Sequence, residues 1–168
     1  MAKAATKSDE PEVVRSVANQ IINRHTAYGA VGGLLPVPVL DLAVIVGVQL
    51  KMIAELAQVY EVSFSENAVK GYVAALIGGG LPVSGVSGMI GSALKGVPVV
   101  GSLIGMFVVP GIAAASTYAV GRVFAWHFES GGTLGDFNVE AARDRFQREF
   151  ERARARVKGG TKETAEAA

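Results

Sequence analysis

The apolar residues of the chain recur at three- and four-residue intervals in several separate segments, which is the spacing of amphipathic helices. Ser8 is placed to cap a first helix, because residues 9–11 supply two acids and a proline suited to a first helical turn. The apolar positions that follow predict that this helix ends within the stretch 28–33. No segment alternates in the manner of a strand, so the pattern predicts an all-α fold.

Two further helices are expected in the first half of the chain. One covers about residues 39–60 and is apolar on all sides at its start but half polar towards its end. Ser63 and Glu66 have the spacing of a capping box, which predicts the start of the next helix. The three glycines 78–80 are expected to end that helix.

Two similar glycine–proline stretches break apolar sequence, GGLLPVP at residues 32–38 and GGGLPVSG at residues 78–85. In a bilayer the backbone polar groups need internal partners, so such breaks must be covered by neighbouring helices or line a polar cavity. Glycine also lets helix backbones approach closely. The structural or functional candidates at these breaks are Pro36, Pro38, Asp41, Gly78, Gly79, Gly80 and Pro82.

Residues 71–94 and 96–121 contain no charged side chain. Each run exceeds the roughly 20 apolar residues that a bilayer-spanning helix needs, although prolines and glycines interrupt both runs. We predict that segment 71–121 forms an apolar hairpin with its turn near residues 95–98. Membrane insertion of this hairpin is favoured. The alternative is a water-soluble bundle in which the more polar helices shield the hairpin.

A last amphipathic helix is expected over residues 138–158, with Asn138 as its cap and Gly131 and Gly132 ending the helix before it. Its apolar stripe and basic end supply the candidate interface residues Phe146, Phe150, Arg152, Arg154 and Arg156. Two interpretations stay open. The stripe either packs on the protein body or on another subunit, which the interleaved acids favour, or it inserts into an anionic membrane surface.

The chain has 168 residues, enough for one domain with a sizeable core. We expect a flexible N-terminus over residues 1–8, a single helical domain over 9–158 and a disordered tail over 159–168. The first residues mix both charge signs and lack an apolar core, so we predict no signal peptide.

Composition shifts the interpretation towards a membrane. Hydrophobic residues make up 50% of the chain and charged residues only 18%, whereas an average soluble domain carries about 25% charged residues. The net charge is +1, which gives no overall field for nucleic acid, so no nucleic-acid partner is expected.

The sequence offers no constellation of residues for catalysis. Cysteine is absent, which excludes thiolate metal sites and a cysteine nucleophile. The stretch 91–102 lacks the Gly-Lys-Ser/Thr ending of a phosphate loop, and no G-x-S-x-G elbow occurs. His25 and His127 have no partner at metal-ligand spacing, so interfacial or capping roles are expected for them. We therefore expect no enzyme activity, no cofactor and no metal.

Asp41 is the one acid between Tyr28 and Leu50. An ionisable residue inside a membrane is a functional candidate, and in that case Asp41 would line a pathway. A helix cap is favoured over this role, because Asp41 follows Pro38 by three positions and its carboxylate can accept free N–H groups of the first turn.

One dense motif, PVPVLDLAVIVGVQLKMIAELAQVYEV at residues 36–62, carries a family resemblance. It resembles the domain-of-unknown-function family found in YcjF-type bacterial inner-membrane proteins and attached to some dynamin- or Era-like GTPases. The resemblance covers roughly residues 20–130, and Val39 departs from it where the family often has glycine. The matching positions include Pro36, Pro38, Asp41, Gln49, Met52, Ile53, Leu56, Ala57, Tyr60, Val62, Tyr118, Gly121 and Arg122.

The resemblance implies a helical, membrane-associated accessory domain with no catalytic residues to carry over. It also implies a GTPase partner that acts in trans, because the sequence shows no GTPase domain of its own. We expect a non-enzymatic scaffold that forms a homo-oligomer at the bacterial inner membrane, with both termini in the cytoplasm. The alternatives are a small transporter or pore with broken helices along its pathway, and a soluble helical module that binds an apolar ligand.

Overall fold

The computed structural model describes residues 10–32, 38–80 and 101–166. These residues form helices and no strand, which confirms the all-α prediction. The helices are α1 (Glu10–Gly32), α2 (Pro38–Val59), α3 (Glu66–Gly80), α5 (Gly101–Glu129) and α6 (Val139–Glu166).

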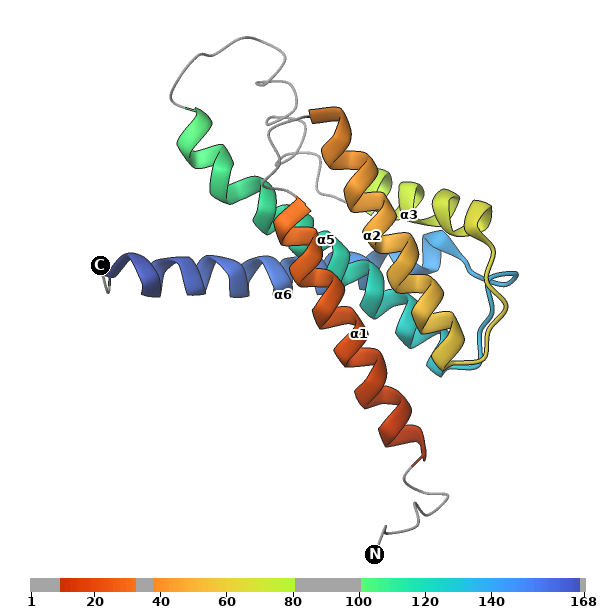
Figure 1. Ribbon diagram of the computed structural model, residues 1–168. Coiled ribbons are helices and arrows are strands. Elements are labelled where there is room, and N and C mark those ends of the chain that lie inside the picture. The colour runs from red at the N-terminus through yellow and green to blue at the C-terminus, as the bar shows by residue number, and fades with distance from the viewer. Residues whose placement is uncertain (1–9, 33–37, 81–100, 167–168) are drawn as a thin grey trace, which may run out of the picture.

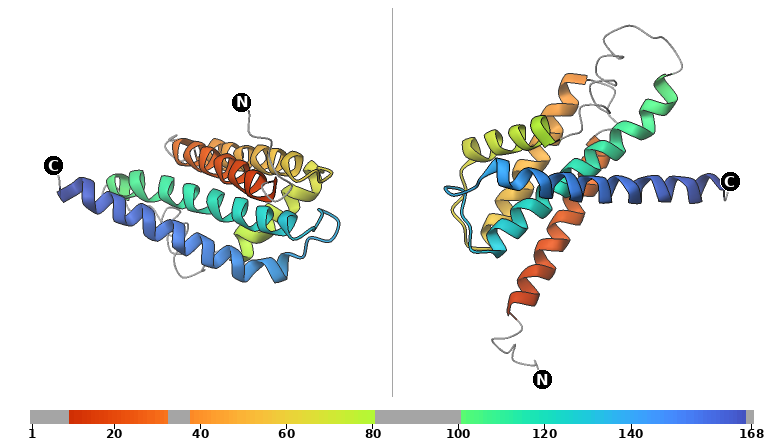
Figure 2. Two further views of the ribbon diagram at one scale, coloured as in Figure 1. Left: turned by 90° about the horizontal axis from the view of Figure 1, so that it is seen from below. Right: turned by 180° about the vertical axis from the view of Figure 1, so that it is seen from behind.

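Helices α1, α2 and α5 lie side by side, with α1 antiparallel to the other two (Figure 1). Helix α6 packs on the side of α5 opposite the α1–α2 pair and crosses the bundle obliquely (Figure 2). Helix α3 lies against α6 and α2. Because α5 has neighbours on both sides, most of its side chains over residues 113–121 are buried and need no polar face, which explains why this part of the helix is uncharged.

The hydrophobic core forms around α5 and draws residues from all of the helices described above. Burying one large apolar side chain of this kind contributes roughly 1.5–3 kcal/mol. The large side chains buried most completely are Ile22, Met52, Ile53, Leu56, Leu76, Phe124, Phe146 and Phe150.

Gly121 marks a close approach of three helices. A Cβ atom placed on Gly121 would lie 2.9 Å from Cγ1 of Ile22 on α1 and 2.9 Å from the sulfur of Met52 on α2. Real Cβ atoms do not come this near to other heavy atoms, so the absence of a side chain lets α1 and α2 close on α5 at this level.

Helix α5 ends at the predicted glycines. Gly131 has a φ of +83°, in the left-handed region that glycine adopts without cost. The N–H groups of Gly131 and Gly132 donate to the carbonyl oxygens of Phe128 and His127 at 2.9 and 3.0 Å. This is the Schellman pattern, which pairs carbonyl groups that the last helical turn leaves free.

Helix α2 ends with the same hydrogen-bond pattern but without a glycine. Glu61 occupies the left-handed position with a φ of +57°. The N–H groups of Glu61 and Val62 donate to the carbonyl oxygens of Gln58 and Ala57 at 3.2 and 2.7 Å. A non-glycine residue in this conformation costs roughly 1–2 kcal/mol, so the end of α2 is a locally strained position.

Asn138 caps α6 as predicted, because its Oδ1 accepts a hydrogen bond from the N–H of Ala141 at 3.0 Å. The helix then continues to Glu166. It therefore passes residue 158, where we expected it to end, and enters the segment that we expected to be a disordered tail.

The structure corrects three details of the predicted helices. Helix α3 begins at Glu66, directly after Ser65, so Ser63 lies too early to be its cap. It ends at the three glycines 78–80, as predicted, but these glycines are its last residues and do not lie outside it. Helix α5 continues through Pro110, which removes one backbone donor without ending the helix.

The predicted apolar hairpin over residues 71–121 is revised as well. Its expected turn, at residues 95–98, lies outside the described part of the chain. The two limbs that are described, α3 and the first part of α5, touch only slightly, because α5 packs mainly against α1, α6 and α2. The described limbs are therefore covered by other helices more than by each other.

Candidate functional site

Charge is distributed unevenly along the bundle of α1, α2 and α5. Residues 25–32, 38–50 and 101–121 contain a single acid, Asp41, and no lysine or arginine. These three segments lie at the same end of the bundle, the upper end in Figure 1. We call them the apolar half.

The opposite end is rich in charged side chains, and ion pairs join its helices. Arg15 of α1 pairs with Glu129 of α5, with Nε donating to Oε1 at 2.7 Å, and Arg24 of α1 pairs with Glu55 of α2. We call this end the charged half, which comprises residues 10–24, 51–65 and 122–138.

Large apolar side chains are exposed on the apolar half. Val31 is 64% exposed, Tyr28 is 51% exposed and Val44 is 37% exposed. They lie on the parts of the adjacent helices α1 and α2 that contain no lysine or arginine. Large apolar side chains are also exposed in the charged half, at Val13, Val17, Phe64 and Trp126. The apolar half is set apart by the lack of lysine and arginine around its exposed apolar groups, which marks it as a surface for lipid or for another protein.

A layer of buried polar side chains crosses the apolar half. Gln49 of α2 is fully buried, and its Nε2 lies 3.4 Å from Oγ1 of Thr117 and 3.5 Å from Oγ of Ser116, both on α5. Oε1 of Gln49 and Oγ1 of Thr26 have no hydrogen-bond partner among the described residues. Bonds of this length are weak, and an unpaired buried acceptor costs about 1–3 kcal/mol. The layer is therefore a weak point of an otherwise closely packed region.

His25 is fully buried at the boundary between the two halves. Its Nδ1 lies 2.9 Å from the carbonyl oxygen of Ile21, so Nδ1 carries a proton and donates. Its Nε2 lies 3.7 Å from Oε1 of Glu55 on α2. His25 thus projects from α1 into the contact with α2. This buried position differs from the interfacial or capping role that we expected.

The candidate residues of the first break are only partly described. Pro38 is the first residue of α2, and Asp41 lies in the first turn of that helix. Proline suits this first position, because its missing N–H would have no partner within the helix. Pro36, Pro82 and the side chain of Asp41 lie outside the described part of the structure. The cap formed by Asp41 stays a prediction.

Of the glycines of the second break, Gly79 lies close to another helix, as expected, and Gly78 does not. A Cβ atom on Gly79 would lie 2.7 Å from Cζ of Arg143 on α6, whereas Gly78 faces open space. The close neighbour of Gly79 is thus the flexible end of an arginine and not a helix backbone. Gly80 is the last residue of α3.

The apolar stripe of α6 packs inside the chain. Phe146 and Phe150 are buried in the core, and their rings stack with centroids 6.1 Å apart. Further along α6, Cγ1 of Val157 lies close enough to Gly111 of α5 that a Cβ on this glycine would be 3.1 Å away. Because Gly111 belongs to the apolar half, the basic end of α6 runs beside that half.

The candidate arginines of α6 are partly paired. Arg152 lies 3.4 Å from Glu149 and Arg154 lies 3.8 Å from Glu151, each one turn earlier in the helix. Arg156 is exposed. Surface pairs of this kind contribute little to stability, so these arginines stay free to meet an anionic surface.

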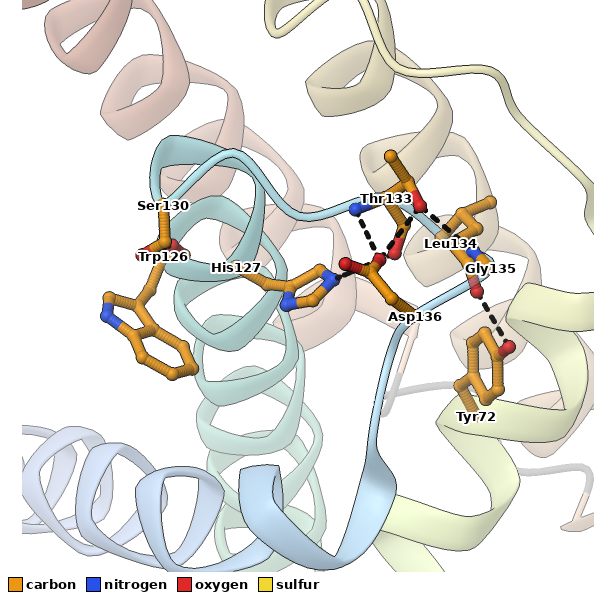
Figure 3. Close-up of polar contacts among 8 residues, drawn as sticks. All are labelled: Tyr72, Trp126, His127, Ser130, Thr133, Leu134, Gly135 and Asp136. Atoms are coloured by element: carbon orange, nitrogen blue, oxygen red, sulfur yellow. Dashed lines mark hydrogen bonds and ion pairs between the residues drawn. The ribbon is translucent and has the colours of Figure 1, made fainter.

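Hydrogen bonds tie the connection between α5 and α6, as Figure 3 shows. Nε2 of His127 donates to the carbonyl oxygen of Thr133 at 2.8 Å and lies 3.4 Å from Oδ1 of Asp136. The same Oδ1 accepts from Oγ1 and N–H of Thr133 at 2.8 and 2.6 Å, and these bonds lower the pKa of the Asp136 carboxyl. Tyr72 of α3 donates to the carbonyl oxygen of Leu134 at 2.8 Å. The connection is therefore fixed to both α5 and α3.

No helix within the described ranges has both the length and the apolar character that crossing a bilayer requires. The transmembrane helix that we expected from the uncharged runs is thus not among these helices. The described residues also contain no group of three or more His, Asp or Glu side chains that could hold a metal ion.

These features define a class of protein, an all-α bundle with one apolar and one charged half. The family model "Domain of unknown function (DUF697)" matches residues 3–155, and the chain belongs to this family. The match confirms the family resemblance drawn from the sequence. Magnetosome membrane protein 22 of Magnetospirillum gryphiswaldense is 34% identical to it over 139 residues, 83% of this chain and 71% of that protein. No solved structure matches the chain.

The sequence did not reveal two groups of side chains that the structure brings together. One is the buried polar layer, for which the signal is Gln49, a lone amide within the otherwise apolar stretch 42–50. The other is a group of arginines around Trp126 in the charged half, which comes from three separate helices. No local pattern encodes such a group, because its members are distant in the sequence.

Proposed function

We propose that this protein is a non-enzymatic accessory protein that docks on the bacterial inner membrane through its apolar half. The observation that carries this proposal is the one-sided distribution of charge along the bundle. Moving exposed apolar surface out of water is favourable by about 25 cal/mol per Å², and Tyr28, Val31 and Val44 offer such surface. The membrane setting is also supported by the name of the relative, a magnetosome membrane protein.

The basic end of α6 supports an anionic lipid surface in particular. Val157 packs at Gly111, so the adjacent residue Arg156 flanks the apolar half. A basic residue close to an anionic leaflet contributes about 1 kcal/mol to binding, and salt weakens this attraction. Insertion of the apolar half and attraction of the α6 arginines act together in this arrangement.

Docking through the apolar half leaves the charged half in the cytoplasm, where it is accessible to a protein partner. The resemblance to domains attached to dynamin- or Era-like GTPases leads us to propose a GTPase partner acting in trans, and self-association of the protein at the membrane. Affinity capture from solubilised membranes, followed by mass spectrometry, identifies the partner. Recovery of no GTPase in the captured material contradicts this part of the proposal.

Flotation of the purified full chain with lipid vesicles tests the docking. We expect it to float with vesicles that contain phosphatidylglycerol and to float less with phosphatidylcholine alone. The substitutions Val31→Glu and Val44→Glu together place two charges on the apolar half at exposed positions and should abolish flotation.

A matched control comes from the same kind of residue in the charged half. Val13 and Val17 of α1 are 55% and 37% exposed, so Val13→Glu with Val17→Glu adds the same charge to a similar surface. This control should float as the unmodified protein does. Equal loss in both double variants, or no flotation of the unmodified protein, rules out docking through the apolar half.

A further inference from the structure

A cavity of about 260 Å³ opens in the charged half where α1, α5 and α6 meet the end of α2. Its charged lining consists of three arginines and one glutamate, which leaves two positive charges in excess. The lining residues that the argument uses are Arg15, Asn19, Tyr60, Arg122, Trp126, Glu129 and Arg145.

Trp126 and Arg145 form one wall of this cavity. Cζ of Arg145 on α6 lies 4.5 Å from the centroid of the Trp126 ring on α5, which is a cation–π contact. Trp126 is 41% exposed and points away from His127, towards the opposite side of α5 (Figure 3). Stacking uses the face of a guanidinium group, so the N–H groups at its edge stay free for a ligand.

Arg122 lies one helical turn before Trp126 on α5. Its Nη1 donates to Oδ1 of Asn19 on α1 at 2.7 Å, which fixes the guanidinium group without neutralising it. The Nε atoms of Arg122 and Arg145 are buried without a hydrogen-bond partner among the described residues. Within the same residues, no carboxylate forms an ion pair with either arginine. Glu129 pairs with Arg15, and Glu149 pairs with Arg152.

The cavity is therefore electropositive and partly shielded from water. Burial lowers the pKa of Arg145 most, and the neighbouring cations Arg122, Arg148 and Arg152 lower it further, while Glu149 acts in the opposite direction. Holding unpaired guanidinium groups near one another costs free energy, which an anion between them would recover. Tyr60 stays protonated and able to donate, since its own pKa is raised by burial and by Glu129.

We infer that this cavity is a binding site for a phosphate group, held between Arg122 of α5 and Arg145 of α6. Guanidinium groups match phosphate oxygens with paired hydrogen bonds, and two of them from different helices suit a tetrahedral dianion. The volume lies below the roughly 300–1,000 Å³ of pockets for drug-sized ligands, so it suits a phosphate-sized group and not a whole nucleotide. The inference is independent of docking through the apolar half, because the cavity lies in the charged half.

The chain contains a single tryptophan, so its fluorescence reports on this site alone. We expect inorganic phosphate and pyrophosphate to change the fluorescence of Trp126 in a saturable way, whereas sodium chloride at equal ionic strength does not. Arg122→Gln and Arg145→Gln should each weaken the apparent affinity at least about tenfold, as expected for the loss of a hydrogen-bonded charge. Arg145→Lys keeps the charge but not the paired geometry and should weaken it less.

The control is Arg156→Gln, which removes the same charge from an exposed position of α6 outside the cavity. Its affinity for phosphate should be unchanged. Far-ultraviolet circular dichroism verifies that each variant is folded, and Arg145→Lys replaces Arg145→Gln if the latter unfolds. Absence of a saturable change with every phosphate probe, or equal weakening in Arg156→Gln and Arg145→Gln, overturns the inference.

The same signal separates a soluble phosphate from a lipid headgroup. Saturation by pyrophosphate in the absence of vesicles, dependent on Arg145, assigns the site to a soluble phosphate. Saturation only by phosphatidylglycerol vesicles, with the same dependence on Arg145 and no effect of phosphatidylcholine, assigns it to a headgroup. Because flotation measures docking separately, failure of one proposal is distinguishable from failure of the other.

Discussion

The two halves of the bundle maintain their structure in different ways. In the charged half, local hydrogen bonds and ion pairs fix the chain, such as the cap at Asn138 and the contact between Thr133 and Asp136. Buried apolar side chains such as Met52, Leu56 and Phe124 pack there as well. In the apolar half, the described core side chains are mostly small, and the buried polar layer is weakly bonded. The charged half thus combines a packed core with directional bonds that fix its geometry, whereas the described part of the apolar half relies mainly on packing.

Helix α6 crosses both halves, so removing its packing should destabilise both of them and should have the largest effect on stability. Phe146→Ala with Phe150→Ala removes two buried rings, each of which contributes about 3–5 kcal/mol. The double variant should lose at least about 5 kcal/mol, enough to unfold many domains, as measured by urea denaturation. The exposed position of Gln147→Ala on the same helix provides a control that should stay near the unmodified protein.

The dependence of the bundle on close contacts is tested at Gly121. Gly121→Ala places a methyl group 2.9 Å from Ile22 and Met52, and the forced movement should cost about 1–3 kcal/mol of unfolding free energy. Gly78→Ala, in open space within α3, should stabilise the protein by up to about 1 kcal/mol, because alanine favours a helix. Gly79→Ala should lie between them, since Arg143 can move aside. Equal effects at Gly121 and Gly78 would mean that the close contact of the helices at Gly121 does not limit stability.

The ends of α5 and α2 in the charged half are expected to show smaller effects, because each depends on one residue in the left-handed region. Gly131→Ala forces a side chain into a φ of +83° and should cost about 1 kcal/mol. Glu61→Gly relieves the strain at +57° and should gain up to about 1 kcal/mol, partly offset by the greater freedom of glycine in the unfolded chain. Thermal unfolding of both variants provides the measurement. A stability change of the same sign in both variants contradicts this account.

The smallest expected effect is the pH dependence of the connection between α5 and α6. Hydrogen bonds from Thr133 lower the pKa of Asp136 below its usual 3.8. The carboxylate therefore contributes stability at pH values above 3.8, and this contribution is lost as the pH falls through the lower value of the folded state. NMR titration should show the lowered pKa, and Thr133→Val should raise it. An unchanged pKa in Thr133→Val means that the hydroxyl group is not its cause.

The helix ends of the charged half could be predicted from the sequence, because they depend on hydrogen bonds between residues close in the sequence. Gly131 and Gly132 end α5 and Asn138 caps α6, each through bonds to residues only a few positions away. The apolar stripe with Phe146 and Phe150 was also visible, because helical spacing reveals it directly.

The apolar half was less predictable because its structure depends on distant contacts. Pro110 suggests a break by its local preference, yet α5 continues through it where neighbouring helices pack. The same limit applies to the candidate site. Arg122, Trp126 and Arg145 come from two helices and contact a third, so no spacing in the sequence could indicate that they share a cavity.

The direction of the helices has an electrostatic consequence for the apolar half. Both α2 and α5 begin there, and the first turn of a helix carries a partial positive charge of roughly half an elementary charge, from the aligned peptide dipoles. The backbone of Asp41 lies in the first turn of α2, a position at which the partial positive charge stabilises a negative charge. Because a medium of low dielectric constant screens such fields less than water does, docking of the apolar half as proposed would make both helix starts act more strongly on a nearby negative charge.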